Sequence, residues 1–358
     1  MNEVRWRSVH VAYHDERCDD LVVDAVAPLF RRTSRHAAAQ YFTRHWRRGP
    51  HLRLNFRATE SAHAAVIRPA VEEVVGGYLA AQPSQARLEP AAFAAQHARL
   101  ARLEREPGPL QPWYPNNSIQ AAAYDDRSAA LGSQAAAALL ASYYVRTTPL
   151  AFRMTDCVRS GGSRLELALD LMLATAHSFC PGGIARGFVS FRSHAEAFLA
   201  SSPQGAPLRA KWNRAYAGRA EGLAGRVRAV VADLDRGIGS IPFIREWARE
   251  LEPIRHTAQQ LLREGLMSMD PVPPGDAGAP PPLAELSPFH RAIESNDRWH
   301  AEVWSTEWFS TYRLSLSHAY LHLTRLGVKP IERLLLCHLA ANTVEDLYGV
   351  SAMSRVAG

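Results

Sequence analysis

The sequence of 358 residues predicts an α+β fold, with a small antiparallel sheet in the N-terminal part and a largely helical C-terminal part. Apolar and polar residues alternate as they do in strands only before Asp125. From Gly132 onward, apolar residues recur at the spacing of amphipathic helices. Hydrophobic residues make up 47% of the chain and charged residues 21%, a composition that suits one large globular domain or two modest ones.

The N-terminal elements are predicted to follow the order β-α-β-β-α. Gly49-Pro50 lies in a four-residue turn between two short alternating segments, which is typical of a hairpin. The second helix carries an apolar stripe from Ile67 to Tyr78. The predicted elements are a strand at 4–14, a helix at 19–31, strands at 40–46 and 51–57, and a helix at 58–81.

The remaining elements are one further strand and a series of helices. Pro90 is placed in the first turn of a helix at 90–105, where its missing N–H costs nothing, and a strand follows at 118–124. We divide the chain into an α+β region at 1–130, with a candidate leader-binding surface, and a helical region at 131–358; the two can also form one continuous domain. The later helices are predicted at 133–146, 163–179, 192–200, 207–236, 242–267, 298–326 and 330–347, with a loop rich in Pro, Gly and Ala at 271–282.

The positive charge of the chain is almost entirely arginine. The net charge is +6 and the pI is near 9.3, yet Lys211 and Lys329 are the only lysines. Arginine binds carboxylates in a bidentate way, so an acidic partner is expected. Nucleic acid is the usual alternative for a basic protein. The sequence contains no recognition-helix motif, zinc finger or aromatic ribonucleoprotein motif, so we predict no nucleic-acid partner.

Other patterns exclude a membrane protein and a metal site. No run of eighteen apolar residues exists, and the segment Met1 to His10 is charged and lacks a signal core, so a cytoplasmic location is expected. The four cysteines lack metal-ligand spacing and are expected to be free thiols. His318 and His322 have an i, i+4 spacing that could bind zinc, but no third ligand is evident.

A polar strand face is the first candidate for function. Alternation places His51 and Arg53 on one face of the strand at 51–57, with apolar residues behind them. We place Arg44 of the preceding strand on the same polar face. Such a face suits a carboxylate, a peptide carbonyl or a developing oxyanion, and it also suits an ordinary solvent-facing sheet surface.

Several segments resemble the C-terminal domain family of lantibiotic dehydratases. One is an aromatic strand ending in Arg-x-aromatic at 41–46, followed by His-Leu-Arg-Leu-x-Phe at 51–56. Three more occur in the family's order: Pro-Asn-Asn-Ser-Ile-Gln at 115–120, Phe-Val-Ser-Phe-Arg-Ser-His at 188–194, and 317–327, which keeps His322 and Arg325 but has Thr324 where the family has asparagine. The resemblance covers most of the chain and implies an enzyme that acts on a ribosomally made peptide.

The region around Tyr124 favours one branch of this family. Elimination domains have an Arg-Glu pair here, and the arginine assists glutamate elimination. This chain has Tyr124 and Asp125 instead, which removes the cation and disfavours elimination. The preceding stretch with Asn117 is similar to stand-alone pyridine synthases of thiopeptide biosynthesis, and it also fits a simple strand-entry turn.

The resemblance to pyridine synthases implies a cofactor-independent reaction, without metal. Two dehydroalanines of a linear precursor peptide undergo a formal aza-[4+2] cycloaddition, one of them reacting with its amide as an imidic acid. Loss of water and of the leader peptide as a carboxamide forms a pyridine and closes a macrocycle. The leader is expected to be acidic. The alternatives are a split elimination enzyme that forms dehydroalanine, and a non-catalytic scaffold that binds the leader.

The proton transfers of such a reaction need acid–base side chains. On a helical wheel Ser317 and Tyr320 share one face, and His322 lies on another. Ser190 or Ser193 is also expected to cap a helix at 195–200, with Arg192 facing the cleft. The predicted catalytic residues are Tyr320, Ser317, His322 and Asp125, and the predicted substrate-binding residues are Arg44, His51, Arg53, Asn117, Tyr124 and Arg192.

Overall fold

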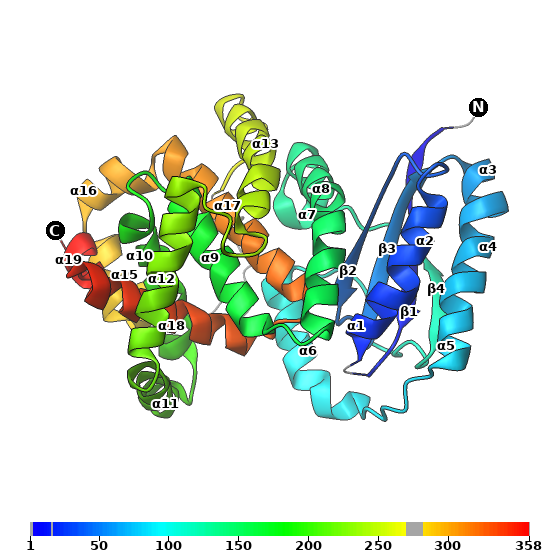
Figure 1. The fold of residues 1–358 in the computed structure, drawn as a ribbon, viewed down its shortest axis with the longest axis horizontal. Coiled ribbons are helices and arrows are strands. Elements are labelled where there is room, and N and C mark those ends of the chain that lie inside the picture. Colours follow the sequence, from blue (N-terminus) through cyan, green and yellow to red (C-terminus); the bar gives the residue numbers. More distant parts are fainter. Residues whose placement is uncertain (1–2, 16, 270–281, 358) are drawn as a thin grey trace. The chain divides into compact units, whose positions relative to one another are not determined.

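The computed structural model describes residues 3–15, 17–269 and 282–357. The chain folds into two compact units, Met1–Gly162 and Ser163–Gly358. The first contains the sheet, and the described part of the second is helical (Figure 1). The predicted α+β fold is confirmed.

The sheet of the first unit has four antiparallel strands in the order β2-β3-β1-β4. The predicted hairpin is the pair β2–β3, in which His45 is opposite His51. Strand β1 then pairs with β3 on one side and with β4 on the other. The strands are β1 (Arg5–Ala12), β2 (Ala39–His45), β3 (His51–Ala58) and β4 (Ser118–Ala122).

One face of the sheet forms the core of the first unit. Leu52, Leu54 and Phe56 alternate along β3 and are almost completely buried, together with Val11 and Phe42 from the neighbouring strands. Two helical segments, each containing π-helical turns, supply the apolar residues that pack against this face (Figure 1). They consist of α1 (Cys18–Leu21), η1 (Val22–Val26) and α2 (Ala27–Thr33), and of α3 (Glu60–Ala62), η2 (His63–Ile67), α4 (Arg68–Val71), η3 (Glu72–Gly76) and α5 (Gly77–Ala81).

Helix α8 (Gln134–Arg159) belongs to the first unit, although it follows the predicted boundary at residue 130. Ala151 is part of the sheet core, and the Phe152 ring stacks on Phe42 at 5.1 Å between centroids. The helix therefore continues past the predicted end at 146, with Pro149 in its interior. Helices α6 (Pro90–Glu104) and α7 (Ser128–Leu131) also lie in this unit.

The second unit is built around α9 (Arg164–Phe179), which other long helices surround. Residues Leu167 to Ala176 are all buried, as expected for a helix in such a position. The other helices are α10 (Ile184–Ser201), α11 (Gly205–Ala217), α12 (Ala220–Arg236), α13 (Ile244–Arg263), α14 (Leu283–Leu286), α15 (Pro288–Glu294), α16 (Asp297–Trp299), η4 (His300–Trp304), α17 (Glu307–Arg325), α18 (Pro330–Tyr348) and α19 (Ala352–Val356).

Besides α8, three predicted helices differ clearly from the structure. Helix α10 begins at Ile184 after the turn at Gly183, so Ser190 and Ser193 lie inside it and the predicted capping role is wrong. The helix expected at 207–236 is two helices, because the chain is not helical at Gly218–Arg219. The helix expected at 298–326 is interrupted before Thr306, whose extended backbone starts α17. The loop predicted at 271–282 lies, up to residue 281, outside the described residues.

Within the ranges that the structure describes, no helix is both long and apolar enough to cross a bilayer.

Candidate functional site

The polar face of the sheet carries a cluster of histidines. Strand pairing places His10 opposite Arg53 and His45 opposite His51. The rings of His10 and His51 stack at 4.6 Å, and the Tyr114 hydroxyl lies 3.2 Å from His10 Nδ1. The predicted face with His51 and Arg53 therefore exists, but residues of the 104–127 segment cover it and both side chains are buried.

Glu106 is the centre of this cluster, and its carboxylate is fully buried. Arg127 Nη1 donates to both carboxylate oxygens at 2.9 Å, Arg53 Nη2 lies 3.3 Å away, and His45 Nε2 lies 3.2 Å away. Burial raises the pKa of Glu106, but the hydrogen bond from His45 and the charges of His45, Arg53 and Arg127 outweigh it and lower the pKa to about 2. Asp125 completes the cluster, with Oδ2 at 3.6 Å from Arg53 Nη1.

Within this cluster the charge on Glu106 is balanced by arginine and not by histidine. Burial lowers the pKa of His45 to about 4, so its ring is neutral at neutral pH and acts there as a hydrogen-bond partner. The guanidiniums of Arg53 and Arg127 then supply the positive charge. A charged His45 attracts Glu106 only in acid, where its ring is protonated.

Three buried polar atoms on the same face have no hydrogen-bond partner within the described ranges. They are Ser8 Oγ, His51 Nε2 and Arg53 Nε. His51 Nδ1 is 2.8 Å from the Gly49 carbonyl, which fixes the proton on Nδ1 and leaves Nε2 as an acceptor. An acceptor and a guanidinium donor on the same strand face can together satisfy an amide group.

Arg44 does not belong to this polar face, and the predicted grouping with His51 and Arg53 is wrong. Strand pairing places Arg44 opposite Leu52, on the face covered by helices. Its guanidinium forms an ion pair with Asp19 of α1. Alternation assigns the residues of one strand to two faces, but it does not show which of these faces continues which face of the neighbouring strand. The register between the two strands determines this, and it places Arg44 on the face covered by helices.

The histidine cluster predicts that the protein loses stability in mild acid. Burial lowers the pKa of His10 to about 3 and that of His45 to about 4, below the ordinary histidine value of 6.5. At a pH below 6.5 but above these lowered pKa values, the unfolded chain binds protons that the folded chain does not. The stability must therefore fall as the pH drops from about 6.5 towards 4. We expect a lower Tm at about pH 5 than at about pH 7, measured by circular dichroism. His45→Gln should reduce this pH dependence, and His256→Gln, at an exposed site, should not.

Asn117 and Tyr124 take different roles in the first unit. Asn117 has a left-handed backbone with φ of 59°, and its amide accepts from Ser84 N and donates to Ser84 O. It therefore braces the chain before β4, as the turn interpretation predicted. Tyr124 stacks on Trp6 at 5.2 Å with 13° between the rings, and its hydroxyl accepts a hydrogen bond from Tyr41.

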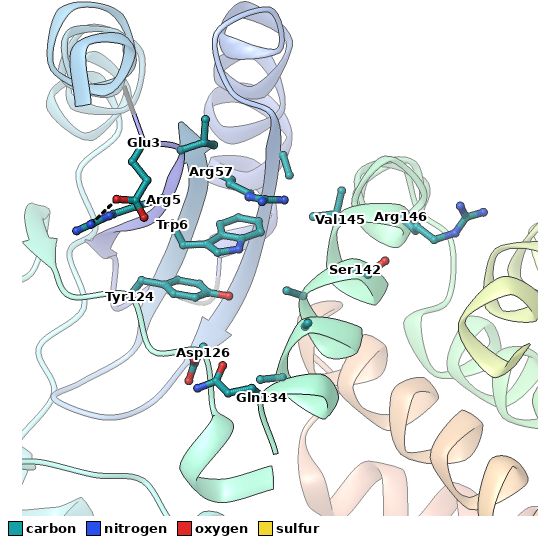
Figure 2. Close-up of a pocket in the computed structure, with 15 residues that line it drawn as sticks. Glu3, Arg5, Trp6, Arg57, Tyr124, Asp126, Gln134, Ser142, Val145 and Arg146 are labelled. Atoms are coloured by element: carbon teal, nitrogen blue, oxygen red, sulfur yellow. Dashed lines mark hydrogen bonds and ion pairs between the residues drawn. The ribbon is translucent and has the colours of Figure 1, made fainter. Parts of the chain in front are cut away.

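Trp6 and Tyr124 line an open groove of about 950 Å³ (Figure 2). The strand ends form one wall, and Ser142 and Val145 of α8 lie on the other (Figure 2). The groove combines an aromatic surface with small apolar residues of α8, and charged residues surround it. The charged residues are Glu3, Arg5, Arg57, Asp126 and Arg146.

Tyr320 lies in a hydrogen-bonded cluster of the second unit. Its hydroxyl is 2.9 Å from His194 Nδ1 and 3.3 Å from Cys337 Sγ. The Arg333 guanidinium lies over its ring at 4.8 Å. Burial, Cys337 and Tyr312 raise the pKa of Tyr320 well above its ordinary value, although Arg333 opposes this, so the phenol stays protonated at neutral pH.

The other predicted residues of the second unit lie apart from this cluster. The exposed Ser317 donates a hydrogen bond to the Arg313 carbonyl, one turn back on α17. His322 is completely buried, with Nδ1 at 2.9 Å from Arg325 Nη2 and its ring 4.7 Å from Trp247. The helical wheel therefore separated Tyr320 from His322 correctly.

Arg192 is held by acidic and amide side chains of α18. It forms an ion pair with Glu345 and donates to Asn342 Oδ1 at 2.5 Å. No site role was predicted from the sequence for Glu106, His45 or Arg127, although His45 lies in the motif at 41–46. The motif at 188–194 contains His194, which was given no role, and this motif was the only signal for it.

Among the described residues, no group of three or more His, Cys, Asp or Glu side chains could hold a metal ion.

A family model described as "Lantibiotic biosynthesis dehydratase C-term" matches residues 6–344. The chain belongs to this family. The predicted family is thereby confirmed. No curated protein sequence matches the chain.

Among solved structures, the pyridine synthase TbtD from thiomuracin biosynthesis is 40% identical to this chain in sequence, and the two structures match with a TM-score of 0.81. The match covers 97% of this chain and 100% of that chain. TsrL matches with 22% identity and a TM-score of 0.72 over 99% of this chain and 98% of its own. The tRNA-dependent lantibiotic dehydratase MibB from Microbispora sp. 107891 matches with 15% identity and a TM-score of 0.50, over 96% of this chain but 28% of its own. The last two likenesses concern the fold alone.

Proposed function

We propose that this protein is a pyridine synthase of thiopeptide biosynthesis. The observation that carries the proposal is the 40% identity to TbtD across nearly the whole of both chains. The site agrees with it, because Tyr124 stacks on Trp6 at the position where the resemblance implies the assisting arginine of an elimination domain. The enzyme joins two dehydroalanines of a precursor peptide in a formal aza-[4+2] cycloaddition, then releases water and the leader peptide.

The reaction requires a proton to move between an amide nitrogen and its oxygen, and a second proton to reach the departing hydroxyl. Tyr320 is the residue that we assign to proton transfer, since its hydroxyl lies in a hydrogen-bonded cluster and stays protonated. Ser317 offers an exposed hydroxyl one turn earlier on α17, whereas the burial of His322 against Trp247 and Arg325 supports a structural role for that residue. Holding the two dehydroalanines together supplies a further part of the rate, about 7–11 kcal/mol in well-oriented systems.

In the first unit, His51 and Arg53 are assigned to orient an amide of the substrate. Their partnerless Nε2 and Nε atoms supply one acceptor and one donor, and the 104–127 segment encloses both atoms in this structure. Asp125 is held beside Arg53 and is assigned to position or accept a proton. The contacts of Arg44, Asn117 and Arg192 support structural roles for these three residues.

Mass spectrometry of a precursor peptide with two dehydroalanines tests the proposal. We expect a macrocycle together with an intact leader carboxamide, whose masses sum with water to that of the precursor. Formation of dehydroalanine from a glutamylated peptide would instead identify a split elimination enzyme. Tight peptide binding without any mass change would identify a scaffold.

The groove beside Trp6 is the surface that we assign to the leader peptide, which we propose to be acidic. Arg5, Arg57 and Arg146 surround it, and aromatic rings can bury apolar leader side chains. Attraction between exposed charges is screened by salt, so affinity for the peptide should fall as ionic strength rises.

We expect Arg57→Gln to weaken binding of the precursor by about two- to fivefold at low salt and to reduce the salt dependence, as for a single exposed ion pair. Arg236→Gln, at an exposed position of α12, is the matched control and should leave the affinity unchanged. Fluorescence anisotropy with a labelled precursor at several salt concentrations measures both quantities. Equal affinities for the two variants would remove the groove from leader binding.

A further inference from the structure

Three helices of the second unit meet at the Tyr320 hydroxyl. His194 comes from α10, Tyr320 from α17, and Cys337 and Arg333 from α18. Helix α10 packs extensively along α18, and α17 also contacts α18. The His194 ring meets the Tyr320 ring edge-on, at 5.2 Å between centroids and 70° between planes. The phenol is thus fixed by contacts from two neighbouring helices.

The direction of the hydrogen bond between His194 and Tyr320 follows from their protonation. Burial, together with Arg333, His290 and Arg313, lowers the pKa of His194 to about 4, so its ring is neutral at neutral pH and one nitrogen is an acceptor. The phenol is protonated and donates to His194 Nδ1. The Cys337 thiol then donates to the phenol oxygen, since burial raises the pKa of Cys337 to about 11.

We propose that His194 is a positioning residue of the cyclisation, which directs the Tyr320 hydroxyl hydrogen and accepts it while Tyr320 takes a proton from the substrate. This rests on the proposed function. When the substrate amide N–H gives its proton to the Tyr320 oxygen, the Tyr320 hydrogen moves to His194 Nδ1. The reverse movement returns a proton to the amide oxygen, so the amide becomes an imidic acid and both side chains are restored.

The geometry distinguishes this role from simple packing, because the nitrogen that faces Tyr320 is Nδ1 and not Nε2. The side-chain oxygen of asparagine occupies the position of Nδ1, whereas that of glutamine reaches the position of Nε2. Asparagine at 194 can therefore still accept from Tyr320. Leucine at 194 fills similar space without an acceptor.

The experiment compares His194→Asn, His194→Gln and His194→Leu with the wild type, using the precursor peptide with two dehydroalanines. We expect His194→Leu to lower kcat by about 100-fold or more with little change in KM, because the proton acceptor is lost. His194→Asn should recover at least about tenfold of this loss, and His194→Gln should recover less. His256→Leu, at an exposed histidine of α13, is the control and should match the wild type.

Circular dichroism melting of each variant verifies folding. If His194→Leu does not fold, the comparison of His194→Asn with His194→Gln still decides, and equal kcat values for these two overturn the role of His194. Wild-type kcat in His194→Leu overturns it as well. If the wild type forms no macrocycle, the proposed function itself fails. If the wild type forms the macrocycle and the His194 variants react equally well, only the role of His194 fails.

Discussion

Tyr320→Phe is expected to abolish macrocycle formation while leaving the affinity for the precursor peptide nearly intact. The substitution removes one hydroxyl, and that hydroxyl is the group that bonds to His194 and Cys337. Loss of a general acid–base group lowers rates by about 10²–10⁴-fold. The ring remains, so its packing with His194 and Arg333 remains as well. Turnover followed by mass spectrometry and peptide binding followed by anisotropy measure the two quantities separately.

Tyr312→Phe provides the matched control on the same helix. Tyr312 is buried, and its hydroxyl donates to the Gly187 carbonyl at 2.7 Å. Its loss should cost about 1 kcal/mol of stability, as for a typical hydrogen bond, without slowing the reaction. Wild-type turnover in Tyr320→Phe would remove Tyr320 from the mechanism.

Glu106→Gln should produce the largest loss of stability among single polar substitutions in the first unit. The carboxylate balances the buried guanidinium of Arg53 and the partly exposed guanidinium of Arg127, and glutamine leaves them only the single, more distant carboxylate of Asp125. Breaking a buried ion pair by removal of one partner costs about 3–5 kcal/mol. Chemical denaturation followed by circular dichroism measures the change in the free energy of unfolding.

The control for this substitution is Glu104→Gln, two residues earlier. Glu104 is exposed and accepts a hydrogen bond from Trp46 Nε1, so its loss should cost no more than about 1 kcal/mol. Acid provides a second check on Glu106, whose pKa of about 2 lies below the ordinary glutamate value of 4.5. Its stabilising effect is complete above about pH 4.5 and is lost as the pH falls towards 2. Similar free energies of unfolding for the two variants would show that the cluster contributes little.

The sequence predicted the strands and most helices because their periodicities are local. Leu52, Leu54 and Phe56 alternate with polar residues, and this alone identifies the core face of β3. The prediction for Arg44 was wrong because the register of the hairpin depends on the geometry of the turn at 46–50 and not on alternation within one strand. The extension of α8 to Arg159 depended on packing of Phe152 against the sheet, which no local pattern reveals.

The candidate site was predictable only in part, for the same reason. The rotation of 100° per residue separated Tyr320 from His322 on a helix, and the structure places them among different neighbours. The partners that define their chemistry come from distant segments. His194 is 126 residues away from Tyr320, and Glu106 is 53 residues away from Arg53. Contacts at such separations follow from tertiary packing and not from spacing.

The burial of Cys337 determines whether its thiol can be alkylated during turnover. A dehydroalanine is an electrophile, and only the thiolate form of a cysteine attacks such groups readily. Cys337 is fully buried beside the Tyr320 hydroxyl, and burial raises its pKa to about 11. Its sulfur is therefore a protonated thiol at neutral pH, although it touches the residue that we assign to proton transfer. Burial thereby keeps this one thiol from being alkylated by a dehydroalanine of the proposed substrate.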